Sequence, residues 1–120
     1  MNAEELVIGV VGPCAAGKTT LVADLRSRGY AVRHIAQEHS YVKDMWKQIS
    51  NPDILIYLDV SFEQSTKRTG TTWSVEIFQK QIKRLEHAKA HSDLYINTEN
   101  LSPEQVLEIA LENLGDLATE

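Results

Sequence analysis

The chain has 120 residues and a net charge of −5; 42% of its residues are apolar and 24% are charged. This length fits one domain, residues 1–120, and the composition is that of a folded protein rather than a disordered one. The acidic balance argues against general binding to nucleic acid or to anionic membranes.

The apolar runs and the cysteine content narrow the expected location. No apolar run approaches the roughly 20 residues needed to cross a bilayer. The longest, residues 6–11, follows Glu4 and Glu5, so we do not expect a secretory signal there. Cys14 is the only cysteine, so no internal disulfide can form. A reducing, cytoplasmic location is the simplest expectation.

The first half of the chain predicts alternating strands and helices. Continuous apolar runs are typical of strands buried on both faces, whereas amphipathic spacing indicates a helix. Gly29 and Pro52 follow the two expected helices, because glycine and proline commonly end them. The expected elements are a strand at 6–11, a helix at about 18–29, a strand at 30–36, a short helix at 42–49 and a strand at 54–60.

The second half predicts mainly helices. Two helix starts carry a capping-box pattern, Ser61-x-x-Gln64 and Ser102-x-x-Gln105, the latter with proline at the first helical position. Between them an apolar stripe with helical spacing indicates a long amphipathic helix. The expected elements are helices starting near 61, 73 and 102, with a short strand at 94–97 before the last helix.

This order of elements predicts an α/β fold with a roughly four-stranded, mainly parallel sheet and helices on both faces. Ligands of such sheets bind at the carboxyl ends of the strands. Gly12, Glu38 and Asp59 fall at or just beyond those ends. We therefore expect the functional site there.

The segment after the first predicted strand, residues 12–19, matches the phosphate-binding motif G-x-x-x-x-G-K-[ST] at every position. In such a P-loop, or Walker A motif, consecutive backbone N–H groups surround a phosphate, and glycines permit the curvature. The next helix directs its N-terminus at the same anion. The residues expected to bind the triphosphate are Gly12, Pro13, Cys14, Ala15, Ala16, Gly17, Lys18, Thr19 and Thr20. A glycine-rich turn without a ligand is the alternative.

Lys18 and Thr19 carry the chemistry that this motif needs. Lys18 is expected to face solvent and to bring a mobile charge to the β- and γ-phosphates, which makes it a catalytic candidate. The Thr19 hydroxyl is expected to bind Mg²⁺. Cys14 either fills the loop as a small residue or provides a reactive thiol. The expected cofactor is Mg²⁺, with ATP or GTP as the ligand.

Together with this loop, two further segments resemble P-loop kinase-type nucleoside triphosphatases, similar to thymidylate and adenylate kinases. Residues 52–63 resemble the family's strand ending in Leu-Asp-Val and the helix after it. Residues 92–98 with 102–106 resemble its last strand and helix. The resemblance implies a three-layer P-loop NTPase fold. It also implies that Arg68 is the lid-entrance arginine that stacks on the base, and a catalytic candidate.

The chain lacks two parts that such kinases usually carry. Only residues 39–53 separate the second predicted strand from the strand at 54–60, where the family has an Asp-Arg pair and an acceptor-binding insertion. Residues 68–73 replace a longer arginine-rich lid, and an Asn-Lys-x-Asp guanine motif is missing. The resemblance thus implies a minimal core without the acceptor insertion and the long lid.

Two acidic residues are candidate metal partners. Glu38 follows the second predicted strand, where it would hold Mg²⁺ or its bound water, or orient the attacking water. The alternative for Glu38 is a solvated acid in a loop. Asp59 ends the central apolar strand, where it would support Mg²⁺ binding or cap the next helix.

Basic and histidine pairs on the long predicted helix have two interpretations each. Lys80 and Arg84, one turn apart, either face the phosphates or lie on the surface. His87 and His91 have the i, i+4 spacing of a metal pair, but no third ligand is evident, which favours a surface pair.

The sequence favours Mg²⁺-dependent binding of a nucleoside triphosphate with slow hydrolysis. The charge of the transition state would need an arginine, supplied by Arg68, by Arg84 or by a partner protein or second copy of the chain. One alternative is a small kinase that acts on a compact acceptor. The other is a non-enzymatic module whose shape changes when nucleotide binds.

Overall fold

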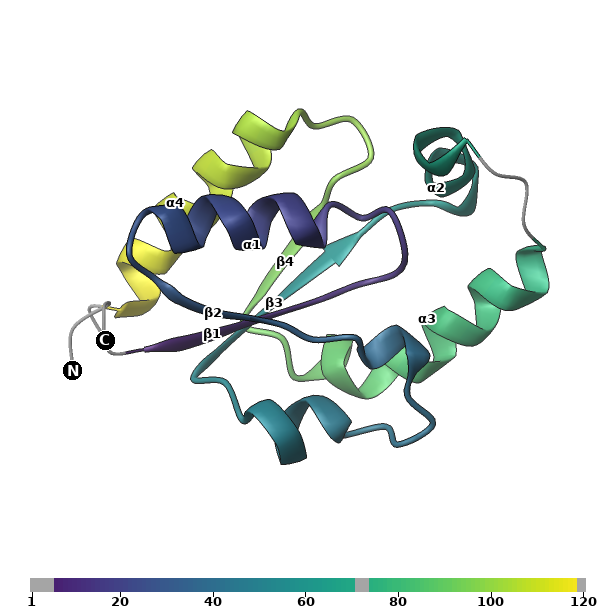
Figure 1. The fold of residues 1–120 in the computed structure, drawn as a ribbon, viewed down its shortest axis with the longest axis horizontal. Helices are drawn as coiled ribbons and strands as arrows, with labels where there is room; N and C mark the ends of the chain where they lie inside the picture. Colours follow the sequence, from purple (N-terminus) through teal and green to yellow (C-terminus); the bar gives the residue numbers. More distant parts are fainter. Residues whose placement is uncertain (1–5, 71–73, 119–120) are drawn as a thin grey trace.

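The computed structural model describes residues 6–70 and 74–118 of the chain. A four-stranded parallel sheet lies at the centre, and helices pack on both of its faces (Figure 1). The α/β class and the parallel direction of the strands are confirmed. Among these residues, no helix is both long enough and apolar enough to cross a lipid bilayer.

The sheet has the strand order β2-β1-β3-β4. Its strands are β1 (Val7–Val11), β2 (Ala31–His34), β3 (Ile54–Asp59) and β4 (Leu94–Asn97). The central strands β1 and β3 are buried along almost their whole length, as their continuous apolar sequences predict. The edge strands β2 and β4 carry several exposed residues. The carboxyl ends of β1 and β2 are therefore neighbours at one end of the sheet.

Side chains alternate between the two faces of β3 and so enter two separate cores. Ile54, Ile56 and Leu58 pack into the core beneath α1 and α4, whereas Leu55 and Tyr57 pack into the core beneath α3. Figure 1 shows α1 and α4 together on one side of the sheet and α3 on the other. The helices are α1 (Lys18–Ser27), η2 (Gln37–His39), η3 (Trp46–Ser50), α2 (Phe62–Thr69), α3 (Val75–Ala90) and α4 (Pro103–Ala118).

Both helix starts predicted from capping boxes are confirmed. The Ser61 hydroxyl accepts a hydrogen bond from the Gln64 N–H at 3.1 Å, immediately before α2. At the start of α4, the Ser102 hydroxyl accepts from the Gln105 N–H at 3.2 Å, and the Gln105 side chain accepts from the Ser102 N–H at 2.8 Å. Trp73, the expected first residue of the long helix, lies outside the described residues.

The segment between β2 and β3 departs from the expected strand and helix. β2 ends at His34 instead of residue 36, and turns followed by η3 replace the helix expected at 42–49. In a regular helix the Val42 carbonyl would accept from the Trp46 N–H. The buried Gln37 side chain takes both partners instead, donating to Val42 O at 2.8 Å and accepting from Trp46 N at 2.9 Å.

Candidate functional site

The 12–19 loop joins the end of β1 to the start of α1 through two positions where glycine is required. A Cβ on Gly12 would lie 2.2 Å from the Leu58 carbonyl oxygen, so β3 leaves no room for a side chain there. Gly17 has a φ of 99° and stands immediately before α1. The chain thus turns sharply into the helix, whose first N–H groups have no partner within the helix.

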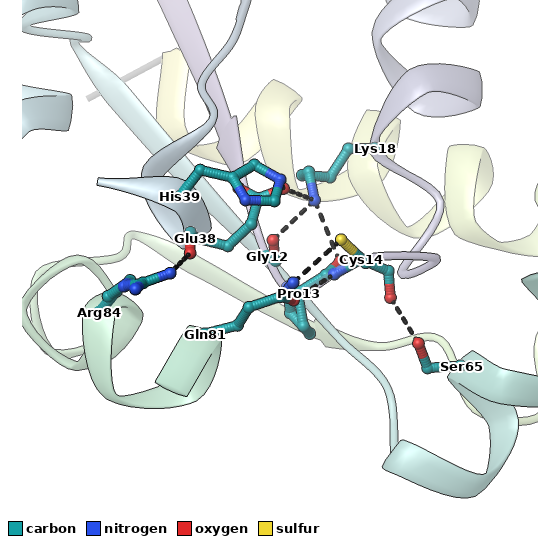
Figure 2. A network of polar contacts seen from close by, with 9 residues as sticks. All are labelled: Gly12, Pro13, Cys14, Lys18, Glu38, His39, Ser65, Gln81 and Arg84. Carbon is teal, nitrogen blue, oxygen red and sulfur yellow. Dashed lines mark hydrogen bonds and ion pairs between the residues drawn. The ribbon is translucent and has the colours of Figure 1, made fainter. Parts of the chain in front are cut away.

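Lys18 folds back into this loop and does not extend into solvent. Its Nζ donates to the carbonyl oxygens of Gly12 at 2.6 Å and Pro13 at 3.0 Å, and it lies 2.8 Å from Glu38 Oε2 (Figure 2). Only 6% of Lys18 is exposed, so the expectation of a solvent-facing lysine was wrong. The cause is the set of oxygen acceptors within the loop and on η2, which satisfy the ammonium group away from water.

Glu38 is a buried acid, not a solvated one. It lies in η2, just beyond the end of β2, and is 4% exposed. One carboxylate oxygen, Oε2, pairs with Lys18, while the buried Oε1 has no hydrogen-bond partner among the described residues. Arg84 donates to the backbone carbonyl of Glu38 at 3.3 Å, which holds this turn against α3. A buried carboxylate oxygen without a partner is energetically costly, and a bound cation would satisfy it.

Residues of the loop, β2, η2 and α2 line one cavity of about 380 Å³. Its lining residues are Cys14, Ala15, Gly17, Lys18, Thr19, Thr20, His34, Glu38 and Arg68. The structure thus brings together the loop, Glu38 and Arg68, as the sequence predicted. His34 was missed, because the predicted strand ran to residue 36, whereas β2 ends at His34. Burial, followed by the charge of Lys18, lowers the pKa of His34 below its ordinary value.

Arg68 fastens the loop to the end of β4. Its guanidinium donates to Ala15 O at 2.9 Å, to Thr98 Oγ1 at 3.1 Å and to Thr98 O at 2.6 Å. It also lines a second cavity of about 230 Å³, on the side of the loop that faces the start of α4. Arg68 therefore stands between the two cavities, with its hydrogen bonds directed at the protein backbone and at Thr98.

Asp59 does not join the other candidate metal ligands. It accepts from the Tyr95 hydroxyl at 2.6 Å and from the Val60 N–H at 2.9 Å, and it does not line the cavity beside Lys18. Burial, and then the hydrogen bond to Asp59, raises the pKa of Tyr95 to about 12. The alternative role of Asp59 as a helix cap was wrong, because Ser61 caps α2.

The two residue pairs of α3, Lys80 with Arg84 and His87 with His91, do not line the cavity beside Lys18. Lys80 and Arg84 line a separate cavity of about 420 Å³ together with Ser40, Tyr41, Lys43 and Lys83. The Arg84 guanidinium lies over the Tyr41 ring, 4.5 Å from its centroid. His87 accepts a hydrogen bond from the Trp46 indole at 3.1 Å and stacks on His91, so this pair packs against η3.

Gln81 is a further residue of the site that the sequence analysis missed. It projects from α3 toward the loop and is 2% exposed. Its side chain accepts from the Cys14 N–H at 3.1 Å and donates to Cys14 Sγ at 3.2 Å (Figure 2). The sequence did contain a sign of this role: Gln81 follows Phe78 by three residues, so it lies on the apolar stripe of the helix, where a polar side chain needs a partner.

Comparison with known protein families finds no family that matches the chain, and comparison with curated proteins finds no significant match.

Proposed function

We propose that the chain is a kinase-like P-loop protein with the three-layer P-loop NTPase fold, which binds a nucleoside triphosphate with Mg²⁺ and hydrolyses it slowly. The observation that carries the proposal is the 12–19 loop between the central strand β1 and the N-terminus of α1. A strand, a glycine-bounded loop and a helix N-terminus with lysine and threonine form an anion site for phosphates.

The residues beside the loop fit Mg²⁺. The Thr19 side chain is exposed and lines the cavity, and Glu38 Oε1 is a buried carboxylate oxygen without a partner among the described residues. Thr19 and Glu38 would hold the ion, which would neutralise phosphate charge when bound. Asp59 is left out of this ligand set, because Tyr95 and Val60 already engage its carboxylate.

Lys18 exchanges one anionic partner for another in this proposal. Without nucleotide, its ammonium is satisfied by Glu38 and by the loop carbonyls. A triphosphate in the loop offers a stronger anion, so Lys18 leaves Glu38 for the phosphates. The Glu38 carboxylate then becomes free to hold the metal or to orient the attacking water.

The hydrolysis is expected to be slow because, within residues 6–70 and 74–118, the arginines nearest the loop already have other partners and do not reach the transferring phosphoryl group. Arg68 bonds to Ala15 and Thr98, and Arg84 lies on Tyr41 and bonds to the Glu38 carbonyl. An arginine that stabilises the transition state contributes a factor of about 10³–10⁵ to such reactions. A partner protein or a second copy of the chain could supply it.

One observation supports the alternative of a small kinase. The cavity of about 420 Å³ that Arg84 lines is also lined by three lysines, Lys43, Lys80 and Lys83. Ser40, another lining residue, is only two residues after Glu38 in the sequence. A small anionic acceptor would fit such a lining. Slow hydrolysis remains favoured, because the chain has no long lid to exclude water from the phosphates.

The test incubates the chain with ATP labelled at the γ-phosphate, Mg²⁺ and each common nucleoside monophosphate, and separates the products. We expect free phosphate to exceed labelled diphosphate with every acceptor, at a turnover below about 1 s⁻¹. Lys18→Met, purified identically, controls for contaminating activity. Labelled diphosphate in excess would establish the kinase, and intact binding with neither product would establish the non-enzymatic module.

A further inference from the structure

Three side chains of metal-ligand type gather beside the loop: the Cys14 thiol, the Glu38 carboxylate and the His39 imidazole. One ligand atom of each lies within 4.8 Å of the other two. Cys14 follows β1 and the others follow β2, so the neighbouring parallel strands bring them to the same end of the sheet (Figure 2). We propose that they bind one Zn²⁺ ion in the absence of nucleotide. This inference does not depend on the proposed function.

Glu38 supplies the first independent support. Its Oε2 lies 3.8 Å from His39 Nε2, while its Oε1 is buried without a hydrogen-bond partner among the described residues. The Lys18 ammonium pairs with Oε2, at 2.8 Å, and not with Oε1. A metal bound to the remaining oxygen and to His39 would satisfy the group that the protein leaves without a partner.

The contacts of Cys14 supply the second independent support for the metal site. Gln81 donates to the Cys14 sulfur at 3.2 Å and accepts from the Cys14 N–H at 3.1 Å. Ser65 donates to the Cys14 carbonyl at 2.9 Å, so the residue is held from two helices. The hydrogen bond from Gln81 to the sulfur fixes the position of the Cys14 side chain beside Glu38 and His39. Such supporting contacts orient ligands in known metal sites.

The ligand types select the metal. Thiolate, imidazole and carboxylate together suit Zn²⁺ and exclude Mg²⁺ and Ca²⁺, which prefer oxygen ligands. Zinc ligands at about 2.0–2.3 Å from the ion lie less than about 4 Å apart, so the present separation must close slightly. The exposed His39 can make that movement. Because Lys18 competes for Glu38, we expect weaker binding than at closed sites with four protein ligands.

The experiment titrates the metal-free, untagged chain with Zn²⁺ against a fluorescent chelator, without nucleotide. The expected stoichiometry is one ion per chain. Cys14→Ser and His39→Gln should each weaken binding at least about tenfold, as losses at metal sites commonly do. His91→Gln is the matched control, since His91 is also exposed but belongs to the His87 pair. Its affinity should stay within about twofold of the unchanged chain.

Cobalt provides a separate readout of the sulfur ligand. Co²⁺ bound to the chain should give a thiolate-to-cobalt charge-transfer band, which Cys14→Ser abolishes and His91→Gln preserves. Circular dichroism would confirm that each variant is folded. The proposal is overturned if the chain does not compete with the chelator, if His91→Gln loses the ion while Cys14→Ser keeps it, or if no thiolate band forms. ATP binding is measured separately, so either proposal can fail alone.

Discussion

Lys18 and Glu38 pair where both side chains are almost excluded from solvent, at 6% and 5% exposure. Removing one partner of a buried ion pair commonly destabilises a protein by about 3–5 kcal/mol, because the other charge remains buried. A substitution of Lys18 therefore alters stability as well as phosphate binding. The effect of a Lys18 substitution on stability can be reduced by also replacing Glu38 with the uncharged Gln, because no unpaired charge then remains buried.

Thr19 is the residue whose substitution tests the metal most cleanly. Thr19→Val keeps the shape of the side chain and removes the oxygen expected to bind Mg²⁺. We expect ATP affinity to fall at least about tenfold with Mg²⁺ present and to stay within about twofold in a chelator. Thr20→Val is the matched control, because Thr20 lines the same cavity and is expected to contact the phosphates but not the metal, so its effect should be equal with and without Mg²⁺. Equal loss with and without Mg²⁺ would show that Thr19 is not a metal ligand.

We expect His34 to make the proposed phosphate binding depend on pH. Burial, followed by the charge of Lys18, lowers the pKa of His34 from its ordinary value, which favours the neutral imidazole in the free protein. A bound triphosphate in the same cavity favours the protonated form and raises this pKa, so binding takes up a proton. ATP affinity should therefore increase as the pH falls from about 8 to about 5.5.

His34→Gln isolates that effect from the protonation of ATP itself. The increase in affinity at low pH should be at least about twofold larger in the unchanged chain than in the variant. Calorimetric titration at both pH values measures it. Identical pH profiles would show that His34 does not contact the phosphates.

The position of Lys18 shows what sequence reasoning misses at the scale of a residue. The loop motif predicted part of the cavity lining, Cys14 to Thr19 apart from Ala16, because the motif depends on neighbours in the chain; Gly12, Pro13 and Ala16 do not line it. It did not predict that Lys18 folds inward, because Glu38 lies 20 positions later and meets it only through strand pairing. Gln81 and Ser65, which hold Cys14, are likewise distant in sequence.

At the scale of the element, the predictable features are those that local contacts determine. The helix starts at Ser61 and Ser102 were predicted, because each capping bond forms within a few residues of the chain. The reciprocal bond of the capping box forms only at Ser102, whereas the Ser61 N–H donates to Glu99. The turns after β2 were not, because the Gln37 side chain intercepts the backbone bond between Val42 and Trp46. Gln37 also donates to the Arg84 carbonyl at 3.2 Å, which ties these turns to α3.

The cap of α4 gives a stability prediction. Ser102→Ala removes the hydroxyl that accepts from the Gln105 N–H and should lower the free energy of unfolding by about 0.5–2 kcal/mol. Ser27→Ala is the control, because its exposed hydroxyl bonds only to the Asp24 carbonyl within the same stretch of helix. That variant should differ from the unchanged chain by less than about 0.5 kcal/mol in urea unfolding. Equal effects would contradict the capping role.

At the scale of the whole molecule, hydrophobic pattern and the order of elements were enough to predict a parallel α/β sheet. The continuous apolar strands β1 and β3 became its buried centre. The position of the candidate site could also be predicted, because parallel strands place their carboxyl ends at the same edge of the sheet. The shapes of the cavities could not be predicted, since they depend on side chains from α2, α3 and the turns after β2.

The central claim, that the 12–19 loop binds the phosphates of a nucleotide, is tested most directly by calorimetric titration with ATP and Mg²⁺. The unchanged chain should bind one ATP, and Lys18→Met should weaken binding at least about tenfold, since hydrogen bonds to charged groups contribute about 1.5–3 kcal/mol. Lys18→Met/Glu38→Gln carries no unpaired buried charge but also lacks a proposed Mg²⁺ ligand, so it should lose at least as much affinity, with folding of both variants checked by thermal melting. A folded variant without Lys18 that binds ATP as tightly as the unchanged chain would contradict the claim.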